Sequence, residues 1–365
     1  MNRRSFIEGL GRASLGLAVA PSLTGLGCSG SATADKGKHW AWVHAGRLSP
    51  DEWRTQCARA HTVGVRALLV SGGDTSSLAD AAHEAGLEFH RWMWTLNRSG
   101  DSWVKEHHPE WFTVSRDGNS TLDRPPYVGY YQWLCPTREP VRDYLRNTVD
   151  IVAAEAGVDG VHLDYVRHSD VILPVGLWSK YGLVQDQEHP EFDFCYCDVC
   201  RDAFRAQTGK DPARLADPTQ DEAWRQFRWN SVTGLVRVLA ETAQARRTPI
   251  SAAVFPTPTL ARRLVRQAWD EWPLDAVFPM LYHTFYEEPV SWIASATRQG
   301  VEALPRRRPL YAGLFLPSLP PEELAAAVYH ARDGGAAGVA LFALEGLTDQ
   351  HLEPLATAFR GWSGA

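Results

Sequence analysis

The sequence lacks the features that identify several large classes of protein. It contains no run of about 20 apolar residues, the length that a transmembrane helix requires, and its apolar run near the start extends only from Leu15 to Ala20. It has no basic excess, since 37 Lys and Arg face 43 Asp and Glu, for a formal net charge of -6. This balance argues against a nucleic-acid partner and favours an uncharged or weakly charged substrate. No G-x-G-x-x-G follows the first strand-like segment, which argues against a dinucleotide-binding fold.

Aromatic residues, by contrast, are abundant. They make up 11% of the chain and include 15 Trp. Broad Trp and Tyr rings can stack on the faces of pyranose rings. We expect most of these rings to pack in the core and a minority to face a substrate.

The first thirty residues are typical of an export leader. Arg3 and Arg4 precede a short apolar run, and the segment resembles a twin-arginine signal, which directs export of a folded protein. Cys28 stands where a lipoprotein leader places its acylated cysteine, although Gly25 occupies a position that such leaders usually fill with an aliphatic residue. We therefore expect a partner in the twin-arginine export machinery and a periplasmic protein, either free or anchored to the membrane through lipidated Cys28. The expected organisation is a leader, a polar tether and one domain, over residues 1–30, 31–38 and 39–365.

From residue 39 onward, short segments rich in β-branched and aromatic residues alternate with longer segments of helical periodicity. This alternation is typical of repeated βα units. Eight units in about 325 residues favour an α/β protein with a closed (β/α)8 TIM barrel. The predicted strands are 40–44, 65–71, 87–96, 160–165, 250–255, 276–283, 310–316 and 338–344. The predicted helices include 50–63, 76–85, 140–156, 258–269, 289–298, 320–333 and 351–359.

Two connections are too long to be simple turns. They follow the third and fourth predicted strands and span residues 97–138 and 166 to about 224. The second includes a helical patch around 198–207. Because the loops after barrel strands lie at the face where barrel enzymes work, we expect these two insertions to build a substrate cleft.

The fourth predicted strand carries the clearest chemical signal. Period-2 alternation places His162 and Asp164 on one face and apolar neighbours on the other, so the polar pair faces the barrel axis. Asp164 falls at the carboxyl end of the strand, where catalytic residues of barrels lie, whereas Asp159 falls at the opposite end. We predict that Asp164 is catalytic. The alternative is a structural salt bridge between Asp164 and Arg167.

The segment from residue 105 to 170 also carries a family resemblance. Its pattern runs through His108-Pro109-Glu110-Trp111-Phe112, Arg116-Asp117-Gly118, Cys135-Pro136 and Pro140-Val141-Arg142-Asp143-Tyr144-Leu145 to Asp159-Gly160-Val161-His162-Leu163-Asp164-Tyr165. In order and spacing it resembles the glycosyl hydrolase-like family 10 proteins. The resemblance implies a (β/α)8 glycosidase with Asp164 in the active site. Arg167 and the cysteine-rich insertion depart from the family pattern and leave the substrate open.

Glycoside hydrolysis normally needs two carboxyl groups. Glu345 directly follows the eighth predicted strand and is our prediction for the second one. Asp170 and Glu287 compete with it, and substrate assistance by an N-acetyl group would remove the need for a second carboxylate.

Several aromatic and basic residues near the predicted strand ends are candidates for substrate binding. Aromatic rings can form sugar subsites, and Arg or His can hold hydroxyls or an acidic substituent. His162 can orient Asp164 or a hydroxyl, or it can be a hydrogen-bonded core histidine. The candidates are His162, Arg167, Arg91, Trp92, Trp94, Tyr130, Tyr131, Trp133, Tyr282 and His283.

The second insertion contains a cluster of cysteines. Cys195, Cys197 and Cys200 lie within six residues, and Cys135 lies in the other insertion. Four converging thiols predict a tetrahedral structural zinc site, and disulfides are the alternative in an oxidising compartment. Cys57 is then a buried free thiol. We expect no cofactor for catalysis.

Three functions remain open from the sequence. The first is a glycosidase that acts on a polysaccharide or cell-envelope glycan through Asp164 and a second carboxylate. The second is a catalytically inactive, carbohydrate-binding barrel lipoprotein, which the absence of an obvious second acid keeps open. The third is a metal-dependent hydrolase, but the first predicted strand lacks the His-x-His pair that such sites use.

Overall fold

The centre of the molecule is a ring of eight parallel strands. The computed structural model describes residues 37–363, so the twin-arginine segment and Cys28 lie outside the described residues. No described helix is both long and apolar enough to cross a membrane. The hydrogen-bonded order is β6-β5-β4-β3-β2-β1-β8-β7. The strands are β1 His39–His44, β2 Val65–Ser71, β3 Glu88–Trp94, β4 Gly160–Asp164, β5 Ile250–Val254, β6 Ala276–Pro279, β7 Tyr311–Phe315 and β8 Gly338–Phe342.

The ring closes between β6 and β7. Two parallel bridges join these strands, Val277 to Leu310 and Met280 to Gly313. The predicted (β/α)8 barrel is thereby confirmed, with β6–β7 as its weakest seam. The sixth predicted strand is wrong at its end: β6 stops at Pro279, and His283 begins a short 3-10 turn instead.

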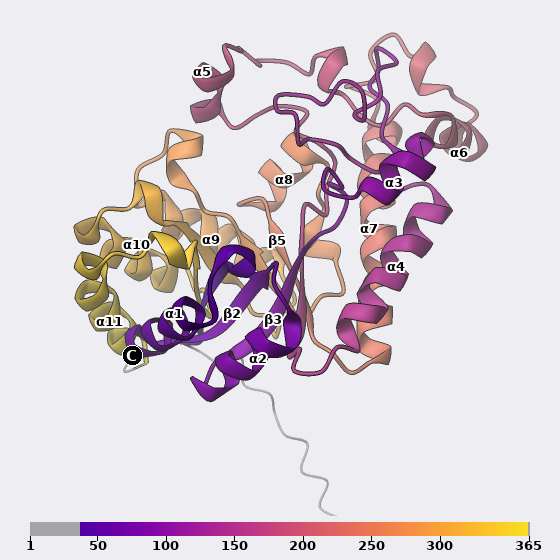
Figure 1. Ribbon diagram of the computed structural model, residues 1–365. Helices are drawn as coiled ribbons and strands as arrows, with labels where there is room; N and C mark the ends of the chain where they lie inside the picture. Colours follow the sequence, from indigo (N-terminus) through magenta and orange to yellow (C-terminus); the bar gives the residue numbers. More distant parts are fainter. Residues whose placement is uncertain (1–36, 364–365) are drawn as a thin grey trace, which may run out of the picture. The chain divides into compact units, whose positions relative to one another are not determined.

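Helices connect the strands and cover the outside of the barrel (Figure 1). Local signals set their ends: α1 begins with Pro50 after a capping box between Ser49 and Glu52, and Gly64 ends it in the left-handed conformation. Helix α8 stops at Val265, earlier than predicted, because Arg266 adopts a left-handed backbone. The barrel helices are α1 Pro50–Val63, α2 Thr75–Glu84, α4 Glu139–Ala153, α7 Glu222–Ala245, α8 Pro258–Val265, α9 Trp292–Ala303, α10 Pro321–Asp333 and α11 Asp349–Ser363.

Side chains alternate between two layers along every strand. The outward set packs against the helices in a large apolar layer that includes Phe89, Val161 and Leu163. The inward set fills the barrel with large rings, among them Trp40 and Trp42. This interior is a packed core and leaves no central pore.

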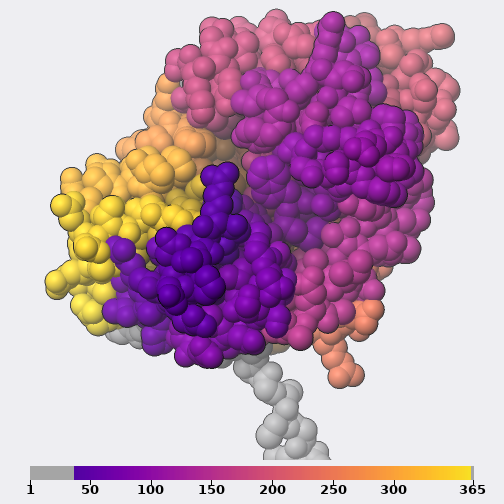
Figure 2. All heavy atoms as spheres, viewed as in Figure 1, coloured from indigo at the N-terminus to yellow at the C-terminus, as the bar shows by residue number. Residues whose placement is uncertain are grey.

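The two long connections form one body at the carboxyl ends of the strands. We call them the β3 insertion, residues 95–138, and the β4 insertion, residues 165–221. Their helices, α3 Ser102–His107, α5 Trp178–Tyr181 and α6 Asp198–Thr208, lie at the top of the view in Figure 1. Figure 2 shows the same region as a continuous purple and pink mass above the indigo and yellow βα units. An antiparallel bridge between Ser115 and Phe194 joins the insertions directly.

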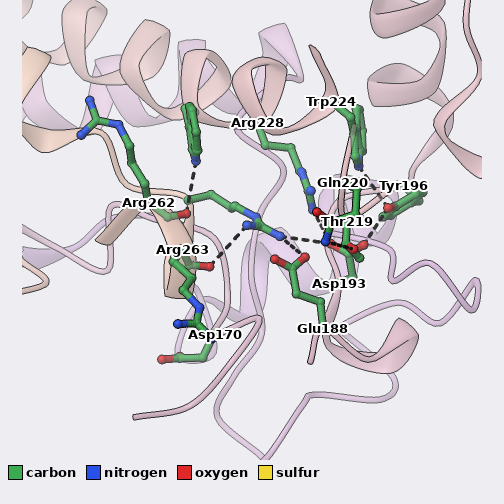
Figure 3. Close-up of polar contacts among 12 residues, drawn as sticks. Asp170, Glu188, Asp193, Tyr196, Thr219, Gln220, Trp224, Arg228, Arg262 and Arg263 are labelled. Atoms are coloured by element: carbon green, nitrogen blue, oxygen red, sulfur yellow. Dashed lines mark hydrogen bonds and ion pairs between the residues drawn. The ribbon is translucent and has the colours of Figure 1, made fainter. Parts of the chain in front are cut away.

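A buried ion cluster fastens the β4 insertion to α7 and to the residue after α8 (Figure 3). Asp193 of the insertion accepts a hydrogen bond from Arg228 of α7, and Arg266 pairs with Glu188. Tyr196 donates to the other oxygen of Asp193 at 2.6 Å. Asp193, Arg228 and Arg266 are at most 1% exposed, so each charge depends on its partners.

The β6–β7 seam gives a direct test of the closed barrel. A Cβ at Gly313 would lie 2.8 Å from the Pro279 carbonyl oxygen and 3.2 Å from Met280 Cα. Since both are backbone atoms, we expect Gly313→Ala to lower the free energy of unfolding by about 1–3 kcal/mol. Urea denaturation would measure the change, with Gly100→Ala as control because nothing lies within 4 Å of a Cβ there. Equal stability of the two variants would contradict the tight closure.

Candidate active site

A cavity of about 320 Å³ opens at the carboxyl ends of the strands. This volume is at the lower end of the range of about 300–1,000 Å³ for small-molecule sites. Four strands, β1, β3, β4 and β8, contribute their last residues, which are His44, Trp94, Asp164 and Phe342. The remaining walls come from both insertions and from the β5 and β6 loops. Its lining residues are His44, Trp92, Trp94, Tyr127, Tyr130, Tyr131, Asp164, Tyr165, Arg167, Asp170, Leu173, Pro174, Leu177, Lys180, Tyr181, Phe255, Met280, Tyr282, Phe285, Tyr286 and Phe342.

A larger hollow of about 620 Å³ lies over the β4 insertion, beside Arg116, Glu188 and Asp217. It contains no residue from a strand end. The smaller cavity is the better candidate because barrel enzymes place their chemistry at the carboxyl ends of the strands.

Asp164 is held in a fixed orientation at the floor of the cavity. Trp92 Nε1 donates to Asp164 Oδ2 at 3.0 Å, and the backbone N–H of Tyr165 donates to Oδ1 at 2.7 Å. Burial raises the pKa of Asp164 above its usual value, although these two donors and the charges of Arg167 and His44 oppose the rise. Each oxygen accepts one N–H, which leaves a lone pair that can carry a proton. The protonated form of Asp164 is therefore more favoured in this site than it would be in water.

Tyr165 shows how the strand end departs from simple alternation. Its φ is 50°, in the left-handed region that residues other than glycine rarely adopt. Tyr165 therefore lines the cavity together with its neighbour Asp164. Its ring lies 4.7 Å from the Trp94 ring. Residues in this conformation are often found at functional sites.

A second carboxylate, Asp170, also lines the cavity. Arg167 Nη1 donates to Asp170 Oδ2 at 2.8 Å, and both side chains are buried. Burial alone lowers the pKa of Arg167, but the charge of Asp170 outweighs it and raises that pKa above the usual value. The guanidinium also lies over Trp133, 4.8 Å from its ring centroid. Arg167 is thus paired with Asp170, and the predicted alternative of an Asp164–Arg167 salt bridge is wrong.

Aromatic rings form most of the cavity wall. Trp94, Tyr130 and Tyr131 make a connected group, with centroid distances of 6.1 Å for Trp94–Tyr130 and 5.2 Å for Tyr130–Tyr131. Tyr130 is 46% exposed, which places it at the rim. On the β6 and β8 side, the Tyr282 and Phe342 rings lie 5.9 Å apart. Rings of this kind can stack on sugar rings while their hydroxyl groups bind sugar hydroxyls.

The structure brings seven of the predicted catalytic and substrate-binding residues together in the lining of this cavity. The seven are Asp164, Arg167, Trp92, Trp94, Tyr130, Tyr131 and Tyr282.

Four predicted binding residues do not line the cavity. Arg91 lies on the outer face of β3, where it donates to the carbonyl oxygens of Gly72 and Gly73. Arg91 and Trp92 cannot both face inward, because neighbours on a strand point to opposite faces. Trp133 and His283 are buried beside the cavity and do not line it.

His162 is the fourth, and it is a core histidine beneath the cavity. Trp42 Nε1 donates to its Nε2 at 3.1 Å, so its Nδ1, 2.9 Å from Ser251 Oγ, carries the ring proton. Burial holds the pKa of His162 well below its usual value, and the ring is therefore neutral. It has no hydrogen bond to Asp164 and acts as part of the floor.

Glu345 lies outside the cavity lining. It is exposed in a short turn after β8, and its Oε1 accepts a hydrogen bond from the backbone N–H of His44 at 2.5 Å. Glu287 also does not line the cavity. Of the three acids considered for the second carboxylate, only Asp170 lines the same cavity as Asp164.

Sequence reasoning missed several lining residues, including His44, Tyr127 and Tyr286. His44 ends β1 on its inward face, so alternation could have identified it; its Nδ1 lies 3.0 Å from Ser71 Oγ. Tyr127 lies in an irregular segment and Tyr286 ends the short 3-10 turn after β6, and no periodic signal exists for either position. Tyr127 donates to the Asp170 carbonyl oxygen at 2.9 Å and so joins the two insertions at the cavity.

Comparisons with known proteins address the fold. No protein-family model matches the chain, and no curated protein matches its sequence. Solved structures do resemble it. A β-galactosidase from the Antarctic haloarchaeon Halorubrum lacusprofundi aligns with a TM-score of 0.62 and 13% identity over 90% of this chain, which spans 58% of the β-galactosidase chain.

Two further structures match over almost their whole length. The PgaB (BpsB) glycoside hydrolase domain from Bordetella bronchiseptica aligns with a TM-score of 0.60 and 13% identity, over 88% of this chain and 98% of the domain. The catalytic domain of the β-amylase from Paenibacillus polymyxa aligns with a TM-score of 0.59 and 12% identity, over 90% and 98%. At these identities the likeness shows the fold alone. The chain has a TIM-barrel fold that is similar to those of glycoside hydrolases.

Proposed function

We propose that this protein is a glycoside hydrolase with Asp164 as its central carboxylate. The observation that carries the proposal is the placement of Asp164 at the floor of a cavity walled by aromatic rings, at the carboxyl end of β4. The glycosidase-like fold and the resemblance to glycosyl hydrolase-like family 10 proteins support the same reaction class. No cofactor is required for this chemistry.

The two carboxyl groups of the cavity have different surroundings and so suit different roles. Burial raises the pKa of Asp164, which suits a general acid that protonates the leaving oxygen. Asp170 forms an ion pair with Arg167 at 2.8 Å, which suits a second carboxyl group that acts as nucleophile or base. We assign Asp164 as the proton donor and Asp170, in preference to Glu345, as the second carboxylate.

The substrate class follows from the walls and from the expected location. A rim with Trp94 and Tyr130 suits a neutral sugar chain, and Lys180 and Arg167 would tolerate an acidic substituent. The proposed substrate is therefore a polysaccharide or cell-envelope glycan, met after twin-arginine export to the periplasm, with or without a lipid anchor at Cys28. The β-galactosidase and β-amylase neighbours are consistent with a carbohydrate substrate.

Loss of the proposed proton donor should abolish turnover. We expect Asp164→Asn to lower kcat/KM by about 100- to 10,000-fold, because the amide keeps the shape but cannot donate the proton. Reducing-end release from a panel of envelope and plant polysaccharides, with the full chain, would measure it. Binding without turnover in both proteins would instead support the catalytically inactive carbohydrate-binding barrel.

The second carboxylate can be identified by a matched pair of variants. We expect Asp170→Asn to lower kcat by about 100-fold or more, since it removes the second carboxylate that lines the cavity. Glu345→Gln is the control and should keep kcat within about twofold, because that side chain lies outside the cavity lining. Circular dichroism would confirm that both variants are folded. The opposite order of activities would reassign the role to Glu345.

The protonation state of Asp164 can be read from a pH profile. Trp92→Phe removes the N–H donor that stabilises the ionised form, so the pKa of Asp164 should rise further. A hydrogen bond to a charged group contributes about 1.5–3 kcal/mol, or about one to two pH units. The alkaline limb of kcat/KM against pH should move upward by that amount, since Asp164 acts while protonated. An upward move of the acidic limb would show that Asp164 acts as a carboxylate instead.

A further inference from the structure

Four cysteine thiols from the two insertions meet at one point, away from the cavity lining. Cys135 comes from the β3 insertion, and Cys195, Cys197 and Cys200 come from the β4 insertion and the start of α6. All four Sγ atoms lie within 4.8 Å of one another, and all four residues are buried. Cys135 Sγ lies 3.4 Å from Cys200 Sγ and 3.7 Å from Cys197 Sγ. Among residues 37–363, this is the one group of three or more potential metal ligands of this kind.

We propose that these four cysteines bind one structural zinc ion. Zinc–sulfur bonds of about 2.3 Å at tetrahedral angles place the sulfur atoms about 3.8 Å apart, close to the two separations above. A set of four thiolates with no position left for water is the donor set of a closed structural site. The proposal is independent of the glycosidase assignment.

A helix N-terminus and polar groups surround the sulfur atoms of the cluster. Cys197 is the N-cap residue of α6 and Cys200 lies in its first turn, so two sulfurs lie at the positive end of an 11-residue helix. The backbone N–H of Val114 points at Cys195 Sγ from 3.4 Å, and Thr137 Oγ1 lies 3.3 Å from Cys200 Sγ. Such donors around the sulfurs are typical of the second layer of a zinc site.

The chain between the ligands is held by contacts that do not involve the thiols. Tyr196 donates to Asp193, and Trp224 of α7 donates to the Tyr196 hydroxyl at 3.0 Å (Figure 3). The Tyr196 backbone N–H also donates to the Val114 carbonyl at 2.7 Å. Tyr196, which stands between Cys195 and Cys197 in the chain, is therefore held by both its side chain and its backbone, independently of the thiols.

The consequence for the active site is mechanical. The β3 insertion carries Tyr127, Tyr130 and Tyr131 of the cavity wall, and the β4 insertion carries Arg167 and Asp170. A zinc ion bound to Cys135 and to three cysteines of the other insertion cross-links the two segments that build the wall. This cross-link would limit how far the two insertions can separate.

The first measurement is the zinc content of the full chain. The protein should be purified through a tag that does not bind metal and analysed by inductively coupled plasma mass spectrometry. We expect about one zinc per chain in the parent and in Cys57→Ser, whose thiol is buried outside the cluster. Cys135→Ser and Cys197→Ser should each lower the content by roughly tenfold or more.

Two readouts on the parent protein keep the proposal testable if the serine variants fail to fold. Cobalt(II) exchanged into the metal-free protein should give the intense visible bands and sulfur-to-metal charge-transfer bands of a tetrahedral tetrathiolate site. Chelation should lower the Tm and expose the insertions to protease before the barrel. Absence of zinc together with absence of the cobalt bands would overturn the proposal. So would a non-reduced mass that shows these cysteines paired as disulfides.

Discussion

The aromatic filling of the barrel is the constraint on which the site depends. Trp40 and Trp42 pack against Phe278 in the interior, at centroid distances of 5.1 and 5.9 Å, and Trp42 also holds His162 by a hydrogen bond. Since this filling leaves no water-filled pore, Asp164 stands on an apolar floor and is desolvated from below. Its raised pKa is thus a property of the whole barrel.

The two insertions complete the upper part of the site. Two separate clusters of side chains connect them to the barrel and to each other. One is the buried ion cluster of Asp193, Arg228, Arg266 and Glu188 that joins the β4 insertion to the barrel helices. The other is the cysteine cluster that joins this insertion to its neighbour. Removal of either partner of a buried ion pair strongly lowers the stability of the fold. The intact pair nevertheless adds little stability compared with apolar packing. The cysteines lie in a small apolar cluster with Phe194, Phe204 and Trp224, and a metal at this point would add a cross-link to that packing.

The sequence allowed us to predict most of the fold and about a third of the residues that line the cavity. The eight strands were predictable because each has a buried, β-branched or aromatic run, and Asp164 was predictable from its inward register at a strand end. Alternation along β3 also requires Arg91 to face outward once Trp92 faces inward, whereas we had predicted that both residues line the site. Glu345 failed to reach the cavity lining for a different reason: the turn after β8 directs it to the His44 backbone. Tyr165 joins the wall only through its left-handed backbone, which no sequence period reveals.

The two carboxyl groups of the cavity show why position alone cannot assign roles. Asp164 and Asp170 are six residues apart in the chain and line the same cavity, but one is surrounded by rings and N–H donors while the other is paired with a guanidinium. Acid–base catalysis by two carboxyl groups requires that their surroundings differ. Arg167 contributes to this difference, because it forms an ion pair with Asp170, whereas Asp164 accepts hydrogen bonds from Trp92 and the Tyr165 backbone. Arg167 departs from the sequence pattern that the segment from residue 105 to 170 resembles, and in the structure it gives one of the two carboxyl groups a charged partner.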